Sequence, residues 1–267
     1  MPTVPATNNA LNSITRQART EPFDLQVARG QITGHTAVSI FGYQATVSNV
    51  AIPIWENATA YTFATSATTL SIASSSATDV SPAAVTINGL DANFNPISEN
   101  VVLTGTAVAT TIGSYLRVNS LVMTGVASGQ TSNAGVITAK QGSNILGQIN
   151  TGIGKSQSTV YTVPNGYSFY LSFAEVNTSN SYTSSNIVTY KVQAINNNNG
   201  VTLNVLQQPF VSIYTANRSS EPFLYPSKTD IQWQLSTSTA TSVAAGVIIA
   251  GKLIKNCLLY TSDAADE

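Results

Sequence analysis

The sequence contains little charge. Only 9% of its 267 residues are Asp, Glu, Lys or Arg, against about 25% in typical globular proteins. Ser, Thr, Asn and Ala are abundant instead. A surface that is polar but uncharged suits stacked β-layers, and it lacks the basic patch that binds nucleic-acid phosphates. We therefore expect no nucleic-acid partner.

Cysteine is absent from all but the last residues. The one cysteine, Cys257, begins segment 257–267, whose sequence matches a translated frame of a transposase-type sequencing-library adapter. We interpret this segment as an adapter-derived tail that is not native, and we exclude it from the fold prediction. Residues 1–256 then offer no disulfide, thiolate metal ligand or cysteine nucleophile. They keep all 11 basic residues and lose three of the 12 acidic ones, so their formal charge is +2 rather than −1.

Long apolar segments are also missing. The longest apolar run, residues 243–251, is far shorter than the roughly 20 residues that span a bilayer, so we expect no membrane insertion. The first residues, Met-Pro-Thr-Val-Pro, lack the basic start and the apolar run of a signal peptide. We expect synthesis and assembly in the cytoplasm.

Residues suited to catalysis are scarce. His35 is the one histidine, so a His-ligated metal site or a Ser-His-Asp triad would depend on it alone. The carboxylates of residues 1–256 are scattered, and Asp91 and Glu99 form the nearest pair in a strand-rich region. Two carboxylates about 5 to 10 Å apart can hydrolyse a glycosidic bond. We predict no catalytic, cofactor-binding or metal-binding residue, and hence no enzyme. A polysaccharide-degrading enzyme stays as an alternative if two carboxylates converge in a cleft.

Residues 84–105 show the pattern that dominates the chain. Val85 and Ile87 alternate with polar neighbours, a Gly, Asp, Asn and Pro cluster covers 89–96, and β-branched residues return at 101–104. This pattern is typical of a strand, a turn and a second strand. The pattern recurs without intervening helical periodicity, which predicts an all-β fold of antiparallel sandwiches rather than a parallel α/β sheet.

The length allows two β-domains. We predict an extended N-terminal arm at 1–44, a first β-sandwich domain at 45–150 and a second β-sandwich or jelly-roll-like domain at 151–256, followed by the tail at 257–267. The arm includes a short helix over 9–19 and carries three bases, Arg16, Arg19 and Arg29. We expect it to dock on its own domain or on a neighbouring subunit, because alone it cannot bury enough surface to offset its ordering entropy.

Turn residues divide both domains into short strands. In the first domain we predict strands at 45–54, 60–64, 68–73, 84–88, 100–104, 114–124, 134–139 and 144–149. In the second we predict strands at 158–164, 167–173, 187–195, 201–206, 209–214, 229–235 and 243–254. Asn165-Gly166 and Asn199-Gly200 predict two tight hairpins. About eight antiparallel strands in the second domain fit a jelly roll or a related sandwich.

One segment has the ending of a phosphate-binding loop. Gly154-Lys155-Ser156 matches that ending, but the pattern requires a glycine where Ile149 stands and a helix afterwards. We favour a flexible linker over 151–157.

An oxygen-rich loop offers ligands at alternate positions, as calcium loops do. These residues are Asp91, Asn93, Asn95 and Glu99. Pro96 stands where the helical calcium loop needs glycine, and Val102 stands in the place of its bidentate glutamate. We favour a hairpin turn whose side chains bond their own backbone, and calcium binding stays open.

The aromatic residues lie mostly at strand-like alternation. They are Trp55, Tyr61, Phe63, Tyr115, Tyr161, Tyr167, Phe169, Tyr170, Phe173 and Trp233. We favour packing in the core and on sheet faces, and a carbohydrate-binding platform is the alternative. Three sequons, at Asn57, Asn177 and Asn217, carry meaning only in a secreted protein.

Several short segments together resemble a family of virion structural proteins of tailed bacteriophages, common in marine and environmental phages. They are 69–77 (TLSIASSSA) with Asp79, 85–93 (VTINGLDAN), 103–105 (LTG), 116–118 (LRV), 133–135 (NAG) and 161–166 (YTVPNG). Segments 23–30 and 34–42 look similar to the family's N-terminal part. The resemblance covers most of residues 20–175. The family usually has a longer Gly-rich loop where residues 80–83 stand.

The resemblance implies a non-enzymatic structural component of a virion. It would decorate the head, or belong to the neck or tail, and would act through packing against other virion proteins, capsid or tail subunits. We expect a homo-oligomer without cofactors. One alternative is a host-recognition module on the virion that binds a receptor or a host-surface glycan, and another is a bacterial surface adhesin.

Overall fold

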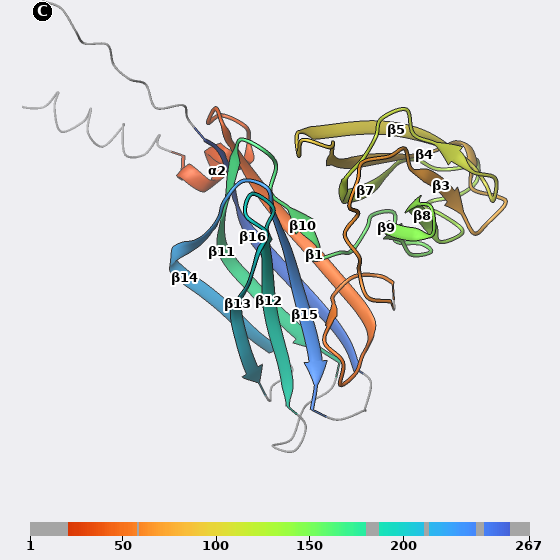
Figure 1. Cartoon of the computed structure of the whole chain (residues 1–267). Helices are drawn as coiled ribbons and strands as arrows, with labels where there is room; N and C mark the ends of the chain where they lie inside the picture. The colour runs from red at the N-terminus through yellow and green to blue at the C-terminus, as the bar shows by residue number, and fades with distance from the viewer. Residues whose placement is uncertain (1–20, 58, 180–186, 211–213, 239–242, 257–267) are drawn as a thin grey trace, which may run out of the picture.

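The computed structural model describes residues 21–57, 59–179, 187–210, 214–238 and 243–256. The helix expected over 9–19, the bases Arg16 and Arg19, and the tail at 257–267 lie outside these residues. The described chain is almost entirely antiparallel β-sheet, as the sequence predicts (Figure 1). One helix, α2 (Phe23–Ala28), packs beside the start of the first strand, with Val27 buried and Asp24 paired to Lys252 at 2.7 Å.

Two facing sheets form the first sandwich, which we call the jelly-roll unit (residues 35–55 and 158–256). One sheet has the order β1-β16-β11-β14, and the other has the order β10-β15-β12-β13 with β2 beside β15. The strands are β1 (His35–Val47), β2 (Ile52–Pro53), β10 (Tyr161–Thr162), β11 (Tyr167–Thr178), β12 (Val188–Asn196), β13 (Val201–Phe210), β14 (Tyr214–Tyr225), β15 (Thr229–Thr237) and β16 (Val243–Lys255).

The strand pairs of this unit are nested. β12 pairs with β13, β11 with β14, β2 with β15, and β1 with β16, all antiparallel. The chain therefore folds back on itself once as a long ribbon and wraps into two sheets. Because the short strands β2 and β10 both pair with β15 and count as one position, this is the arrangement of an eight-stranded jelly roll. Strand β16 shows why the sequence fits it, because Val243, Ala245, Val247 and Ile249 are buried while the residues between them are not.

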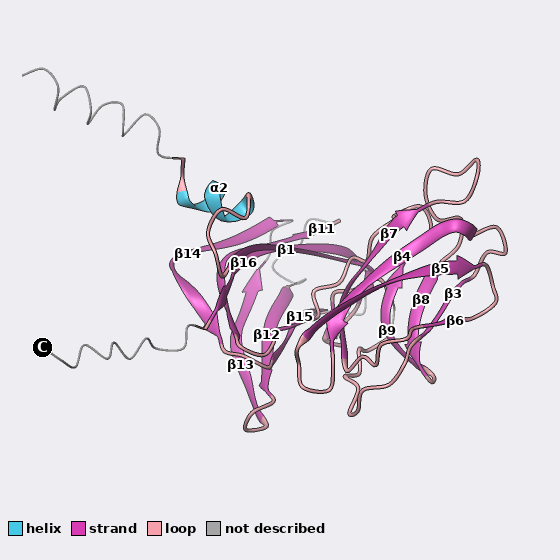
Figure 2. Ribbon diagram, turned by 90° about the horizontal axis from the view of Figure 1, so that it is seen from above, coloured by secondary structure: helices cyan, strands magenta, loops and turns pink. Residues whose placement is uncertain are grey.

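A second sandwich is inserted between β2 and β10, and we call it the inserted unit (residues 56–157). Its sheets have the orders β6-β3-β8-β9 and β5-β4-β7, and it lies beside the jelly-roll unit (Figure 2). Its strands are β3 (Ser71–Ser74), β4 (Val80–Leu90), β5 (Pro96–Thr104), β6 (Ala109–Thr110), β7 (Arg117–Gly125), β8 (Ile137–Gln141) and β9 (Asn144–Ile149). An antiparallel bridge between Trp55 and Ser158 joins the two points where the chain leaves and re-enters the jelly-roll unit.

Each unit has its own hydrophobic core. Phe169 and Trp233 belong to the cluster of the jelly-roll unit, and Trp55, Tyr115 and Leu121 belong to that of the inserted unit. The ten aromatic residues favoured for packing are all buried or partly buried, so their main role is in these cores and on the sheet faces.

The boundary between arm and first domain was wrong. Residues 35–44 form most of β1 and pair with β16 from His35 opposite Ile254 to Gln44 opposite Ala245. The inward positions of this strand include Gly42, which lies against Thr159 and Ile54, and Gln44, which donates to the Trp55 carbonyl at 3.0 Å. Glycine and glutamine at core positions hide the apolar alternation. The jelly-roll unit is therefore discontinuous in sequence. The other domain covers residues 56–157 instead of the predicted 45–150.

Two of the expected hairpins are confirmed and one is wrong. β4 pairs with β5 across the turn in residues 84–105, and β12 pairs with β13 across Asn199-Gly200. At Asn165-Gly166 the turn forms, with Gly166 at a φ of 76°, but β10 and β11 enter opposite sheets. The strand expected at 60–64 does not form. Of the strand expected at 209–214, residues 211–213 lie outside the described part.

Candidate functional site

A buried ion pair joins the two units. Arg117, on β7 of the inserted unit, donates from Nε and Nη2 to the two carboxylate oxygens of Asp230 on β15, both at 2.8 Å. The side chains are 5% and 2% exposed. This two-pronged geometry matches the planar guanidinium to the carboxylate.

The remaining polar atoms of this pair also have partners. Arg117 Nη1 donates to the Ala64 carbonyl at 2.7 Å, and its guanidinium lies 4.8 Å from the centre of the Phe63 ring. Asp230 accepts from the Thr162 hydroxyl at 2.6 Å and from Asn197 Nδ2 at 2.9 Å. Because both charges are fully hydrogen-bonded, their burial is tolerated. We call this arrangement the inter-unit ion pair.

Further hydrogen bonds fix the same interface. Asn119 donates from Nδ2 to the Thr162 carbonyl at 2.9 Å and accepts from the Thr162 backbone N–H at 3.0 Å. The Asn165 N–H donates to the Phe94 carbonyl at 2.7 Å. These bonds and the inter-unit ion pair hold the two sandwiches in one orientation.

A cleft of about 620 Å³ lies between β1 of the jelly-roll unit and strands β4, β5 and β7 of the inserted unit. Its polar lining consists mainly of hydroxyl and amide side chains. These include Ser39, Asn88, Ser98, Asn119, Ser120 and Ser158. Lys155 is the one charged residue that the described chain contributes to the lining, and Tyr161 forms part of the wall. The volume lies within the range of small-ligand sites.

Main-chain groups of β1 add to this lining. Lys255 N–H donates to the Gly34 carbonyl at 2.7 Å, so by antiparallel alternation the even-numbered residues of β1 bond to β16. The odd-numbered residues Ala37, Ser39 and Phe41 turn their N–H and C=O groups to the opposite edge of the strand. All three residues line the cleft.

The oxygen-rich loop is a self-bonded turn. Asp91 Oδ1 accepts from the N–H groups of Asn93 and Asn95, both at 2.8 Å. Glu99 faces elsewhere and accepts from the backbone N–H groups of Ile112 and Gly113 at 2.8 and 2.9 Å. Asp91 and Glu99 line one surface depression, and the bonds to Asp91 Oδ1 and to the two Glu99 oxygens are made to backbone N–H groups of the inserted unit.

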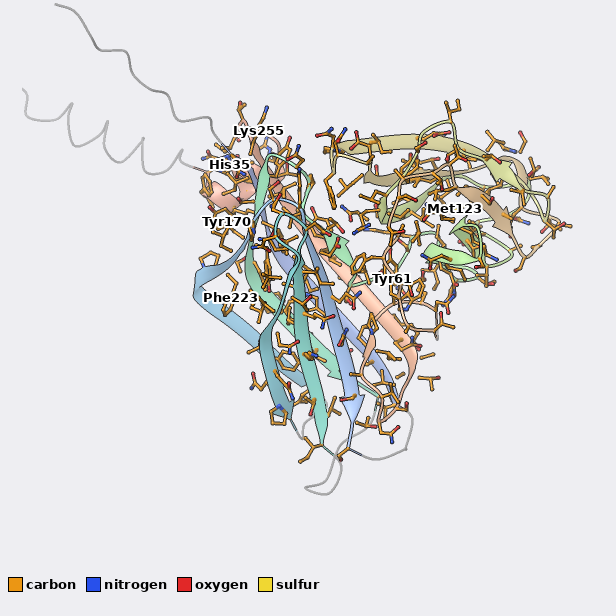
Figure 3. The ribbon with its side chains drawn as sticks, viewed as in Figure 1. His35, Tyr61, Met123, Tyr170, Phe223 and Lys255 are labelled. Carbon is orange, nitrogen blue, oxygen red and sulfur yellow. The ribbon has the colours of Figure 1, made fainter. Side chains whose placement is uncertain are left out.

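Two further candidates from the sequence are segment 151–157 and His35, and the structure places both within the fold. The expected linker 151–157 is packed, because Ser156 Oγ accepts from the Leu121 N–H at 2.9 Å and the Gly154 carbonyl accepts from the Met123 N–H at 2.8 Å. No helix follows it in the described chain, as a phosphate-binding loop would require. His35 lies at the end of β1 beside Lys255 (Figure 3), with Nδ1 3.1 Å from the Thr33 carbonyl oxygen.

Within the described residues, no group of three or more His, Cys, Asp or Glu side chains could hold a metal ion. Among the same residues, no helix is both long enough and apolar enough to span a membrane. The sequon residue Asn57 donates to Gln148 Oε1 at 3.1 Å and caps its own turn.

The residues that hold the units together have no recognisable signature in the sequence. Arg117 belongs to segment 116–118 of the family resemblance, and Asp230 belongs to none of its segments. A single Arg and a single Asp separated by 113 positions show no pattern until the strands that carry them are placed.

Glu56, the first residue of the inserted unit, is a buried carboxyl at the junction. Oε1 accepts from the Asn150 N–H at 3.2 Å, whereas Oε2 is buried without a protein hydrogen-bond partner. Burial raises the pKa of Glu56 from 4.5 to about 7, against the lowering effect of backbone hydrogen bonds from Gln157 and Asn150. The folded state therefore favours the protonated carboxyl.

We expect Glu56 to make folding stability fall as pH rises. Its pKa is higher in the folded chain than in the unfolded chain, so its stabilising effect is complete below about pH 4.5 and is lost by about pH 7. After discounting for partial solvent screening, the loss is on the order of 1 to 2 kcal/mol. Urea unfolding at pH 5 and pH 8 should show this loss relative to Glu56→Gln, which cannot titrate. A constant difference between the two proteins would contradict the prediction.

These features define an all-β protein with a jelly-roll unit, a sandwich inserted between its short strands β2 and β10, and a fixed orientation between the two. No protein-family model matches the chain, and no curated protein matches it.

Among solved structures, the chain is similar to the VP2 subviral particle of infectious bursal disease virus, at 12% identity and a TM-score of 0.23, over 88% of this chain and 78% of that one. A mutant VP2 protein of the same virus, in derived T=1 particles, is similar at 13% identity and a TM-score of 0.23, over 89% and 76% of the two chains. At this identity and TM-score, the likeness supports no conclusion about this chain.

Proposed function

We propose that the chain is a non-enzymatic structural component of a tailed-phage virion, placed on the head or in the neck or tail. It acts by packing against copies of itself and against other virion proteins. The nested jelly-roll pairing, with a second sandwich fixed beside it, is the observation that carries the proposal. Jelly rolls form viral capsid domains, although they also form lectins and cupins.

Two further observations support this role. Polar side chains that the sequence offers for chemistry bond backbone N–H groups within the inserted unit, as Asp91, Glu99 and Ser156 illustrate. The family resemblance of residues 20–175 points to the same class of particle. On this proposal, the protein is assembled into the virion in the host cytoplasm.

Peptide mass spectrometry on density-purified virus particles tests the proposal. Trypsin should release Val118–Lys140 and Gln141–Lys155. We expect both peptides in particles at a constant ratio to capsid proteins, and the copy ratio would separate head decoration from neck or tail. Absence from particles together with recovery in cell envelopes would overturn the proposal in favour of a surface adhesin.

A second function is favoured by the cleft. Its hydroxyl, amide and main-chain groups could bind the hydroxyls of a host-surface glycan, with Lys155 as the one charge. Glycan-array binding that is lost in Ser39→Trp, which would fill the cleft, and kept in Ser66→Trp, at an exposed position of the inserted unit, would support a host-recognition module. Equal binding by both variants would contradict it.

A further inference from the structure

Two strands on one side of the jelly-roll unit have free edges. Among the described residues, β14 pairs with β11 alone and β13 pairs with β12 alone, so each ends its sheet. Figure 1 shows the two strands on the same side of the sandwich, and Figure 3 places Phe223 on that side. A free edge presents unpaired N–H and C=O groups that can bond to another strand.

Large apolar side chains are exposed along these edges. Leu203 is 56% exposed, Leu224 is 55% exposed and Phe223 is 39% exposed. Val201 and Val205 are also exposed, and Leu206 is partly buried. We call this set of six residues the β13–β14 seam.

The position of Leu203 shows that the core of the jelly-roll unit is not fully covered at the seam. Leu203 lies opposite Ala194, a core residue, so its side chain leaves the sheet on the face that elsewhere builds the core. The opposite sheet does not cover it, and more than half of its surface stays exposed. The core of the jelly-roll unit is therefore open at this edge.

The shape of the seam favours binding of another protein surface over binding of a small molecule. Val205, Leu206 and Phe223 line an apolar groove that reaches Trp233 inside the sandwich. Its volume is about 10 Å³, which is room for roughly one water molecule. An occupant must therefore lie across the groove instead of entering it.

The sequence of β13 selects the kind of surface. Natural edge strands are usually protected by charge or proline, but residues 201–208 contain neither. A bulge near Val205 and Pro209, close to the end of the strand, are the protective features that β13 has. An uncharged edge does not repel an identical edge. Two copies related by a two-fold axis would each offer the same strand and the same apolar row, which closes the contact at two.

We propose that the β13–β14 seam is the contact between two copies of this chain, with β13 of one copy adding antiparallel to β13 of the other. The inference rests on the proposed role in subunit packing and names the surface that performs it. The paired strands would join two five-stranded sheets, and the apolar row of each copy would cover that of the other.

Sedimentation velocity of the full chain across a concentration series tests the inference. We expect a monomer–dimer equilibrium whose dissociation constant rises at least tenfold in Leu203→Lys. Val108→Lys is the matched control, because Val108 is 60% exposed in the inserted unit and should leave the equilibrium unchanged. Val205→Lys provides a second test if the first variant does not fold.

Hydrogen exchange adds a readout that locates the contact. The amides of residues 201–208 should exchange more slowly as the concentration of the chain rises, and Leu203→Lys should abolish that dependence. A chain that stays monomeric, or a dimer that all three variants weaken equally or none weakens, would overturn the inference. The particle mass spectrometry does not depend on self-association in solution, so the two proposals can fail separately.

Discussion

Arg117→Ala is expected to destabilise the folded chain by about 3 to 5 kcal/mol. The substitution leaves Asp230, whose side chain is 2% exposed, as a buried charge without its partner. Asp230→Ala should cost a similar amount, since it strands the guanidinium. Denaturant unfolding can follow each unit, because Trp55 lies in the core of the inserted unit and Trp233 in that of the jelly-roll unit.

Two comparisons sharpen this test. Arg29→Ala removes a surface ion pair with Glu21, in which Arg29 is 59% exposed, and should cost less than about 1 kcal/mol. The double substitution Arg117→Met with Asp230→Leu should be more stable than either single alanine variant, because it removes both buried charges. A double variant that is no more stable than the single alanine variants would contradict this prediction.

Asp79→Asn is expected to cost about 2 to 4 kcal/mol. Asp79 is fully buried, and its oxygens accept from the Ala134 N–H at 2.8 Å, the Gly135 N–H at 2.9 Å and the Ser74 hydroxyl at 2.6 Å. An amide turns one of these oxygens into a donor that faces other donors, which leaves buried groups unsatisfied. Hydrogen exchange should show faster opening of residues 127–135, the loop that this carboxylate anchors.

The same substitution at Asp91 is the control. Asp91 also accepts two backbone N–H groups, but both bonds go to Oδ1 at a partly exposed turn. An amide oxygen can replace Oδ1 there, so Asp91→Asn should cost less than about 1 kcal/mol. Equal losses at the two positions would mean that burial of the acceptor does not set the cost.

Local patterns predicted most of the strands and several turns, whereas pairing across the chain could not be predicted from them. Alternation in residues 84–105 identified β4 and β5, and Asn199-Gly200 identified the turn between β12 and β13. At Asn165-Gly166 an equally good turn signal gave the wrong pairing, because a tight turn can also carry the chain from one sheet to the other. The dipeptide fixes the backbone dihedrals but not the partner of the next strand.

The same contrast between local and long-range contacts applies to the candidate sites. The turn at Asp91 could be predicted because its hydrogen bonds are made within a few residues. The cleft and the β13–β14 seam could not, since both depend on which strands end a sheet and on what faces them. Gly42 and Gln44 concealed β1, and with it the edge that lines the cleft.

The nesting of the strand pairs also sets an order of folding during synthesis. β1 must wait for β16, and His35 can meet Ile254 only after the residues between them have been synthesised. The pairings of the inserted unit, by contrast, all lie within residues 56–157. Closing a short loop costs less entropy than closing a long one. The inserted unit can therefore be complete while the jelly-roll unit around it is still an open ribbon.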